Sequence, residues 1–267
     1  MTPLLKRSPR AHKGDHGTLG ILGGATGTVG AGFLAARAAL FAGAGRVYLV
    51  RPSLADGCVL DPLTPEVMVI DAAELSARRI TAWLVGPGLG VTEAAHQLLR
   101  QILGGITPVV IDADALNLIA EDPALGRQCA RRGAATVITP HPGEAARLMR
   151  CSIEQIQADR NSAAQTLAQR LNAIAVLKGA GTVITNPSGD RSVNLTGNAA
   201  LATGGTGDVL AGVIAALIAQ GVDPLIAARE AVRFHGLAAE RLTERTGGMV
   251  GVTASELIPE IRGLLNQ

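Results

Sequence analysis

The clearest chemical signal in this sequence is a glycine-rich segment, GGTGD at residues 204–208, that leads directly into an apolar helical stretch. Glycines just before a helix allow backbone N–H groups to converge on an anion, and the positive end of the helix favours negative charge there. A carboxylate in an anion site would repel a phosphate, so Asp208 suits a base that takes a proton from a hydroxyl attacking phosphorus. The alternative is an acidic residue at a helix start after a flexible turn, and spacing alone does not separate the two.

Two further polar segments follow apolar, strand-like runs. In TPHPGE, two prolines stiffen the backbone and would present His141 and Glu144 into a crevice; a rigid turn with Glu144 at a helix start is the alternative. In DADALN, the two acids would suit a bound substrate or hydrated magnesium, whereas Asp114 or Asn117 can simply cap the next helix. For Asn117 we favour the capping interpretation.

A lysine and a second glycine segment complete the set. Lys178 ends a strand-like run and begins the turn KGAGT, which would hold a nucleotide phosphate beside room for a purine or ribose; a solvated surface lysine is the alternative. The GGATGTVGA segment (residues 23–31) begins a loose dinucleotide fingerprint, Gly30-x-Gly32-x-x-Ala35, but these residues fall inside the predicted helix. In addition, Arg51 follows the next strand where an acid is needed. The segment also lacks the Lys-Ser/Thr of a Walker A loop, so it indicates only that a ligand can approach the backbone.

The histidines and cysteines do not suggest a metal site or a disulfide framework. His96 and His235 lie in helical stretches, where we expect surface or packing residues. Three cysteines (Cys58, Cys129 and Cys151) are far apart without CxxC spacing, so we expect small buried side chains.

The elements that must position these residues alternate along the chain. Strand-like apolar runs at 19–22, 47–50, 67–70, 82–85, 108–111, 136–139, 174–177 and 182–185 alternate with helical stretches at 31–41, 92–103, 152–171 and from 206 onward. Strands that are apolar on both faces predict a mostly parallel central sheet with helices on both faces. No linker or repeat divides the chain, so we expect one domain over residues 1–267. In such folds ligands bind where strands end, which is where the motifs cluster.

Composition limits the possible partners. Of 267 residues, 48% are hydrophobic but only 2% aromatic, and the formal net charge is +2. These values argue against a disordered chain and a nucleic-acid binder. The N-terminal residues lack the apolar core of a signal peptide, and the longest apolar helical run, 209–222, is too short to cross a bilayer. We therefore expect a cytoplasmic protein that does not enter membranes.

Seven segments together resemble one family. They are HKGDHG, GGATGTVGA, GPGLG, DADALN, TPHPGE, VLKGAGTVI and NLTGNAALATGGTGDVLAG, in family order between residues 12 and 212. In these segments the chain resembles the ADP-dependent NAD(P)H-hydrate dehydratases of the ribokinase-like superfamily. Any one segment is moderately specific, whereas the ordered set is very specific. The resemblance implies the stand-alone form, without the epimerase domain that some relatives carry.

The resemblance implies an α/β, ribokinase-like three-layer sandwich and a repair reaction. Members convert the S epimer of NAD(P)H hydrate to NAD(P)H, using ADP to phosphorylate the C6 hydroxyl and then eliminating phosphate, with AMP as the other product. Hydroxide is a poor leaving group and phosphate a good one, so the nucleotide serves activation. Asp208 would deprotonate the hydroxyl. Mg²⁺ is the expected cofactor, ADP the co-substrate and a homotetramer the expected assembly.

Site residues also follow from the resemblance. The hydrate-side contacts would be Ala31, Gly88, His141 and Asp208. The nucleotide-side contacts would be Lys178, Gly179, Ala180, Gly181, Thr182 and Gly207. The amides of Gly205, Thr206 and Gly207 would form the anion hole. Glu144 would contact Mg²⁺ indirectly, through water.

Other functions remain to be weighed. A small-molecule kinase of the same superfamily would share the base and the anion hole, but such kinases typically carry Asn in a TPNxxE segment where this chain has His141. A non-catalytic nucleotide-binding protein would have little use for Asp208 in its anion site. A nicotinamide-dependent oxidoreductase is disfavoured by the misplaced fingerprint.

Overall fold

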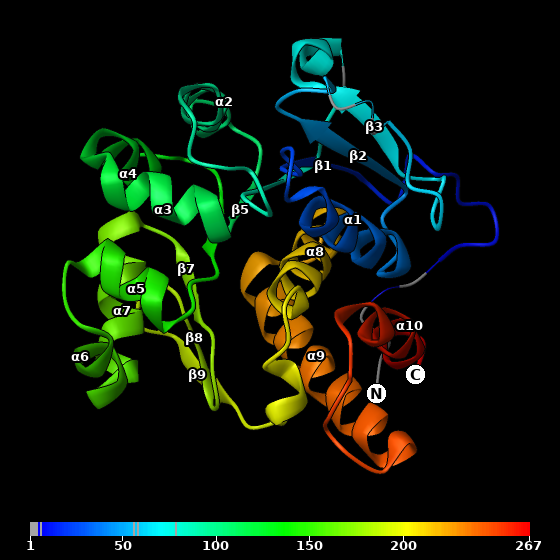
Figure 1. Cartoon of the computed structure of the whole chain (residues 1–267). Coiled ribbons are helices and arrows are strands. Elements are labelled where there is room, and N and C mark those ends of the chain that lie inside the picture. The colour runs from blue at the N-terminus through cyan, green and yellow to red at the C-terminus, as the bar shows by residue number, and fades with distance from the viewer. Residues whose placement is uncertain (1–4, 6, 56, 58, 78) are drawn as a thin grey trace.

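A mixed sheet forms the centre of the molecule. The computed structural model describes residues 5, 7–55, 57, 59–77 and 79–267, and in them nine strands pair in the order β3-β2-β1-β4-β5-β6-β7-β8-β9 (Figure 1). The strands are β1 (Thr18–Leu22), β2 (Arg46–Arg51), β3 (Met68–Asp71), β4 (Ala82–Val85), β5 (Val109–Ile111), β6 (Thr136–Ile138), β7 (Ile174–Leu177), β8 (Thr182–Thr185) and β9 (Arg191–Asn194). All pairings from β3 to β7 are parallel, whereas β8 and β9 add to the edge in antiparallel fashion.

Helices cover both faces of the sheet and make two buried apolar clusters. One face carries α1 (Val29–Phe41), α8 (Thr206–Ala219), α9 (Pro224–Thr246) and α10 (Ala254–Leu265). The other carries α2 (Glu93–Leu103), α3 (Ala113–Glu121), α4 (Pro123–Ala130), α5 (Pro142–Met149), α6 (Ile153–Ala158) and α7 (Arg160–Leu171). Short 3₁₀ turns, η1 (Ala72–Ala77) and η2 (Ala199–Leu201), lie in connections. The predicted three-layer α/β sandwich is confirmed.

The strands serve both clusters because successive side chains point to opposite faces. In β4, Leu84 belongs to the cluster under α1 and α8, whereas Trp83 and Val85 belong to the other one. Small residues compensate for the scarcity of aromatic side chains by allowing close approach. A Cβ on Gly212 of α8 would lie 2.3 Å from the Ala35 carbonyl oxygen of α1, so these two helices pack almost backbone to backbone.

Most predicted elements are present, but several differ from the prediction. The helical stretch 152–171 is divided into α6 and α7 at Asp159, whose carboxylate accepts a hydrogen bond from the Ser162 N–H and starts a new helix. The helices α3, α4 and α5 and the edge strand β9 are absent from the predicted elements. β9 is half exposed and carries polar residues, so it lacks the apolar run of the buried strands. The capping interpretation of Asn117 is wrong, because Asp112 is the N-cap of α3 and Asn117 lies inside that helix, where its Oδ1 accepts a hydrogen bond from Arg147 Nε at 2.8 Å.

Other expectations concern single residues and membranes. Cys129 is buried and Cys151 is half-buried, while Cys58 lies outside the described residues. Among the helices of the described chain, none has both the length and the apolar content to cross a membrane.

Candidate active site

Five neighbouring parallel strands deliver the sequence motifs to one edge of the sheet. In sheet order, β1 is followed by Gly23, β4 by Gly86, β5 by Asp112, β6 by the 139–144 segment and β7 by Lys178. The carboxyl ends of parallel strands meet at the same edge, which is the usual ligand-binding edge of such sheets. The motifs that are far apart in the sequence therefore form one row.

The loops after β1 and β4 lie against each other. The Gly24 N–H donates to the Pro87 carbonyl at 2.9 Å, and the Thr28 hydroxyl donates to the Gly88 carbonyl at 2.9 Å. Gly88 has φ +58°, and a Cβ there would lie 2.4 Å from the Thr28 carbonyl oxygen, so only glycine fits. The Ala31 N–H donates to that same carbonyl from the first turn of α1. The structure thus brings Ala31 and Gly88 together, as the hydrate-side assignment requires.

His141 and Glu144 form a reciprocal cap at the start of α5. The Gly143 N–H donates to His141 Nδ1 at 3.0 Å, and the His141 N–H donates to Glu144 Oε2 at 2.7 Å. Nδ1 must therefore be unprotonated, which leaves the ring proton on Nε2. Burial, then Lys178 and Arg147, lower the pKa of His141, so the imidazole is neutral near pH 7. The helix-start interpretation of Glu144 is correct, and it is compatible with a role at the site.

A buried cluster of charges lies behind this cap. Lys178 Nζ is 2.7 Å from Asp112 Oδ1 and 4.0 Å from Glu144 Oε2, and the side chains of both acids are almost fully buried. Burial alone would lower the pKa of Lys178, but the two carboxylates outweigh it and the pKa is raised. Burial raises the pKa of Glu144 to about 7, although Lys178 opposes the change. Lys178 is thus a half-buried, charged residue and not a solvated surface lysine.

Asp208 is the third residue of α8, whose first turn points toward the cluster. Gly205 precedes the helix with φ +89°, which a residue with a side chain rarely adopts. Burial and, next, the Asp112 carboxylate raise the pKa of Asp208 to about 7, and Lys178 only partly offsets them. A carboxyl group with that pKa is suited to take up a proton near neutral pH.

Gly207 joins the helix start to the charge cluster. A Cβ on Gly207 would lie 3.3 Å from Lys178 Nζ and 4.0 Å from Asp112 Oδ2. The beginning of α8, with its backbone N–H groups and positive dipole end, therefore faces a lysine across a short gap. Of these groups, the Thr206 N–H donates to the Thr203 carbonyl at 3.4 Å. This pairing of amides and an ammonium group is suited to a phosphate, with Asp208 beside it.

The predicted nucleotide-side residues form the tight turn between β7 and β8. Gly179 has φ +140° and Gly181 has φ +65°, while the Thr182 hydroxyl donates to the Gly179 carbonyl at 2.8 Å. Arg160 of α7 holds this turn from below, since its Nη2 donates to the carbonyls of Leu177 and Lys178 at 2.9 and 3.2 Å. Ala180 is exposed at the turn. The turn follows Lys178 directly, so the lysine and the turn share one edge of the site.

Three supporting residues were not found by sequence reasoning. Arg160 holds the turn just described, and Arg51 is fully buried with its Nε donating to the Gly24 carbonyl at 2.6 Å. Arg51 could have been found from the sequence, because a charged residue at the end of an apolar strand indicates a buried polar contact. His235 was expected to be a surface or packing residue; it is buried, and its Nε2 lies 2.9 Å from the Thr206 carbonyl oxygen.

The site does not contain a preformed metal cage. In the part of the chain that the structure describes, no three His, Cys, Asp or Glu side chains gather as a protein-bound metal would need. Both Glu144 oxygens already face partners, since Oε2 accepts the His141 N–H and Oε1 is 3.4 Å from His141 Nε2. A hydrated ion held chiefly by phosphates fits this arrangement, because Mg²⁺ retains waters and needs only one or two carboxylates.

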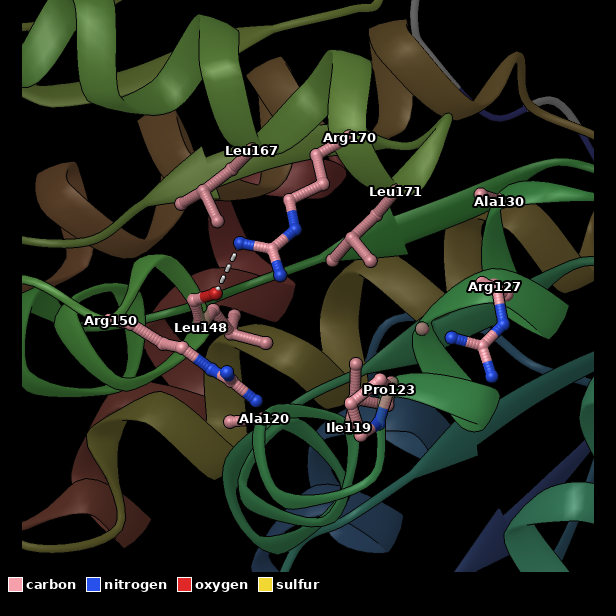
Figure 2. A pocket seen from close by; sticks show the side chains of 11 residues that line it. Ile119, Ala120, Pro123, Arg127, Ala130, Leu148, Arg150, Leu167, Arg170 and Leu171 are labelled. Atoms are coloured by element: carbon pink, nitrogen blue, oxygen red, sulfur yellow. Dashed lines mark hydrogen bonds between the residues drawn. The ribbon is translucent and has the colours of Figure 1, made fainter.

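A cavity of about 220 Å³ lies elsewhere, between α3, α4, α5 and α7 (Figure 2). Its floor is apolar, with Ile119, Leu148 and Leu167, and its rim carries Arg127, Arg150 and Arg170. Arg170 Nη1 donates to the Leu148 carbonyl at 2.8 Å across it. None of the predicted site residues lines this cavity, so we do not assign the reaction to it.

Comparison with known proteins shows the family to which the chain is similar. The family model described as NAD(P)H-hydrate dehydratase matches residues 19–262. The chain is 42% identical to the ADP-dependent (S)-NAD(P)H-hydrate dehydratase of Neisseria meningitidis, over 98% of this chain and 89% of that protein. It is 41% identical to the bifunctional NAD(P)H-hydrate repair enzyme Nnr of Escherichia coli, over 98% of this chain but only 50% of that protein.

Solved structures show the same fold. The ADP/ATP-dependent NAD(P)H-hydrate dehydratase of Bacillus subtilis, co-crystallised with ATP and Mg²⁺, superimposes with a TM-score of 0.84 at 32% identity, over 98% of this chain and 93% of that one. The family model, the Neisseria relative and the Bacillus subtilis structure all carry the description NAD(P)H-hydrate dehydratase. The chain belongs to the NAD(P)H-hydrate dehydratase family.

Proposed function

We propose that this chain carries out ADP-dependent dehydration of (S)-NAD(P)H hydrate, with Asp208 as the base. The observation that carries the proposal is the position of Asp208, with its pKa raised to about 7, at the start of α8 beside Lys178. A base there is useful only if a proton must leave a hydroxyl next to a phosphate. The relatives named above are dehydratases of this hydrate, so the C6 hydroxyl of the nicotinamide ring is the group to be activated.

In the first step the C6 hydroxyl oxygen attacks the β-phosphorus of ADP. Its proton passes to Asp208, the bond between the β-phosphorus and the bridging oxygen breaks, and AMP leaves. The N–H groups of Gly205, Thr206 and Gly207, together with Lys178, stabilise the charge on the transferring phosphoryl group. Preorganised amides at a helix start suit this task because they need little reorganisation during the reaction.

In the second step the C6–O bond breaks and phosphate leaves with the bonding electrons. The C5 proton passes to solvent, and the electrons of the C5–H bond form the C5–C6 double bond of the ring. Phosphate leaves far more readily than hydroxide, which explains why a nucleotide is consumed in a dehydration.

We assign the two substrates to different parts of the sheet edge. Ala31 and Gly88, in the paired loops after β1 and β4, lie where the hydrate would bind, with His141 and Asp208 completing that side. The KGAGT turn, with Lys178, Gly179, Ala180, Gly181 and Thr182, lies where the adenosine part of ADP would bind, and Gly207 lies where its phosphates would enter. The hydrate side is supported by the contact of Thr28 with both Ala31 and Gly88.

We propose Mg²⁺ as the cofactor. Mg²⁺ would neutralise charge on the phosphates of ADP. The phosphate oxygens and water would supply most of its ligands. We assign Glu144 to the ion, and its buried, already bonded carboxylate supports a contact through water.

The test mixes the purified protein with (S)-hydrated NADH, ADP and Mg²⁺ and follows the return of reduced-nicotinamide absorbance. We expect recovery that needs ADP and yields AMP, and a loss of at least about 10³-fold in kcat for Asp208→Asn, with ADP still bound. No recovery with ADP or ATP would overturn the proposal. Phosphorylation of a small alcohol without dehydration would instead favour a kinase.

The resemblance also supports the proposed assembly, and the lack of a linker or repeat in the sequence supports the domain assignment. We propose that residues 1–267 act as one domain and assemble as a homotetramer. Sedimentation equilibrium checks the assembly, with an expected mass four times the 27.2 kDa of one chain.

A further inference from the structure

The segment that carries the anion hole lies along α9. Residues 195–205 connect the edge strand β9 to α8, and Figure 1 shows this stretch in yellow running beside the orange helix α9. The Gly197 N–H donates to Glu240 Oε1 at 2.7 Å, and Asn198 Nδ2 donates to the Thr243 hydroxyl at 2.9 Å. One helix thus holds the segment at successive points along its length.

His235 continues this row of contacts into the anion hole itself. Its side chain is buried, and Nε2 lies 2.9 Å from the carbonyl oxygen of Thr206, the first residue of α8. A carbonyl oxygen only accepts, so Nε2 carries the proton and donates it. Burial lowers the pKa of His235 to about 4, with a further contribution from Lys178, so the ring is neutral at working pH.

The planar peptide bond transmits this contact to the reacting phosphate. The Thr206 carbonyl and the Gly207 N–H belong to one rigid, trans peptide unit and point in opposite directions. Fixing the carbonyl therefore fixes the direction of the Gly207 N–H, which we assign to the anion hole. Gly207 has no side chain to restrict its backbone dihedrals, so the Thr206–Gly207 peptide plane depends on outside contacts to hold its orientation.

The other end of Thr206 is also held. Its hydroxyl donates to the carbonyls of Leu201 at 2.8 Å and Thr203 at 3.0 Å. The hydroxyl fixes the residue, and His235 fixes the peptide plane that follows it.

We infer that His235 is a positioning residue of the phosphoryl-transfer step, which holds the Thr206–Gly207 peptide so that the Gly207 N–H points at the transferring phosphoryl group. This inference rests on the proposed function. It predicts a change in kcat and not in substrate binding. A misdirected Gly207 N–H would stabilise the transition state less, because negative charge on the phosphoryl group develops there.

The experiment compares His235→Leu with His235→Gln, whose amide can donate from a position similar to that of Nε2. We expect His235→Leu to lower kcat about 10- to 100-fold in the hydrate assay, with KM for ADP within about threefold, and His235→Gln to recover most of the loss. The matched control is Thr185→Val. It removes a buried 2.7 Å hydrogen bond to Gln165 at the opposite edge of the sheet and should leave kcat unchanged.

Thermal unfolding of each variant separates positioning from general destabilisation. If His235→Leu does not fold, His235→Asn replaces it, because its shorter side chain does not bring a donor to the carbonyl. An active wild type with an unchanged kcat in His235→Leu or His235→Asn overturns the inference, and so does a folded His235→Gln without recovery. An inactive wild type overturns the proposed function instead.

Discussion

The two halves of the site edge are built in different ways. The loops after β1 and β4 are fixed by backbone hydrogen bonds and by glycines at which a Cβ would clash, as at Gly88. After β5, β6 and β7 the site is built from charged side chains, with Lys178 Nζ 2.7 Å from Asp112 Oδ1 and 4.0 Å from Glu144 Oε2. The first half can select a ligand by shape, whereas the second half sets the pKa of Asp208 at the start of α8.

This contrast predicts different consequences of substitution in the two halves. Changes among the glycine loops should act on folding and the shape of the site. Changes in the charge cluster should act on the chemical step and its pH dependence.

The largest effect is expected for Gly86→Ala, on the glycine side. Gly86 has φ +126°, and a Cβ would lie 1.7 Å from the Asp112 carbonyl oxygen, which is backbone and cannot move away cheaply. We expect a loss of at least about 3 kcal/mol in the free energy of unfolding, measured by urea denaturation. Gly30→Ala is the matched control, because no atom lies within 4 Å of its Cβ position, and it should be near neutral. Equal stability of the two variants would remove the steric argument.

Gly207→Ala, on the charged side, should act on catalysis instead. The new Cβ lies 3.3 Å from Lys178 Nζ, where the phosphate is expected, but the backbone there is ordinary helix that alanine favours. We expect kcat/KM for ADP to fall about 10-fold or more, equal to ~1.4 kcal/mol, while the unfolding midpoint stays within experimental error. Steady-state kinetics and thermal unfolding measure the two effects. A Gly207→Ala variant that loses stability but keeps its kcat/KM would contradict the expected difference between the two halves of the site.

A smaller effect is expected on stability in Asp208→Asn. The native pKa of Asp208, about 7, lies above its ordinary value of 3.8, so the native state binds the proton more tightly than the unfolded state. Wild-type stability from this group is present below pH 4 and is lost as pH rises through 7. Asp208→Asn should therefore be more stable than wild type at pH 8, by about 1–2 kcal/mol after allowance for partial exposure, and the difference should vanish near pH 4. A constant difference across this range would contradict the raised pKa.

Sequence patterns predicted the sheet and the row of motifs because buried parallel strands are short apolar runs that end in the functional segments. They did not predict β9, whose polar residues follow no apolar run, or the break at Asp159, which depends on a local cap. The pattern identified Asp208 and Lys178 as candidates, but their burial depends on strands and helices distant in the sequence. His235 illustrates the limit, because its partner Thr206 is 29 positions away and a histidine in a helix has no distinctive spacing.

The most direct test of the charge cluster is the pH dependence of kcat/KM for AMP formation in wild type, Asp112→Asn and Glu144→Gln. The wild-type rate should rise with pH through an apparent pKa near 7, since Asp208 must be ionised to act as the base. In Asp112→Asn the inflection should move to lower pH, because a repelling carboxylate is lost and Lys178 is released to Asp208. In Glu144→Gln an inflection should remain, although Glu144 also has a pKa of about 7. An inflection that stays in place in Asp112→Asn, or disappears in Glu144→Gln, would contradict the assignment of Asp208 as the tuned base.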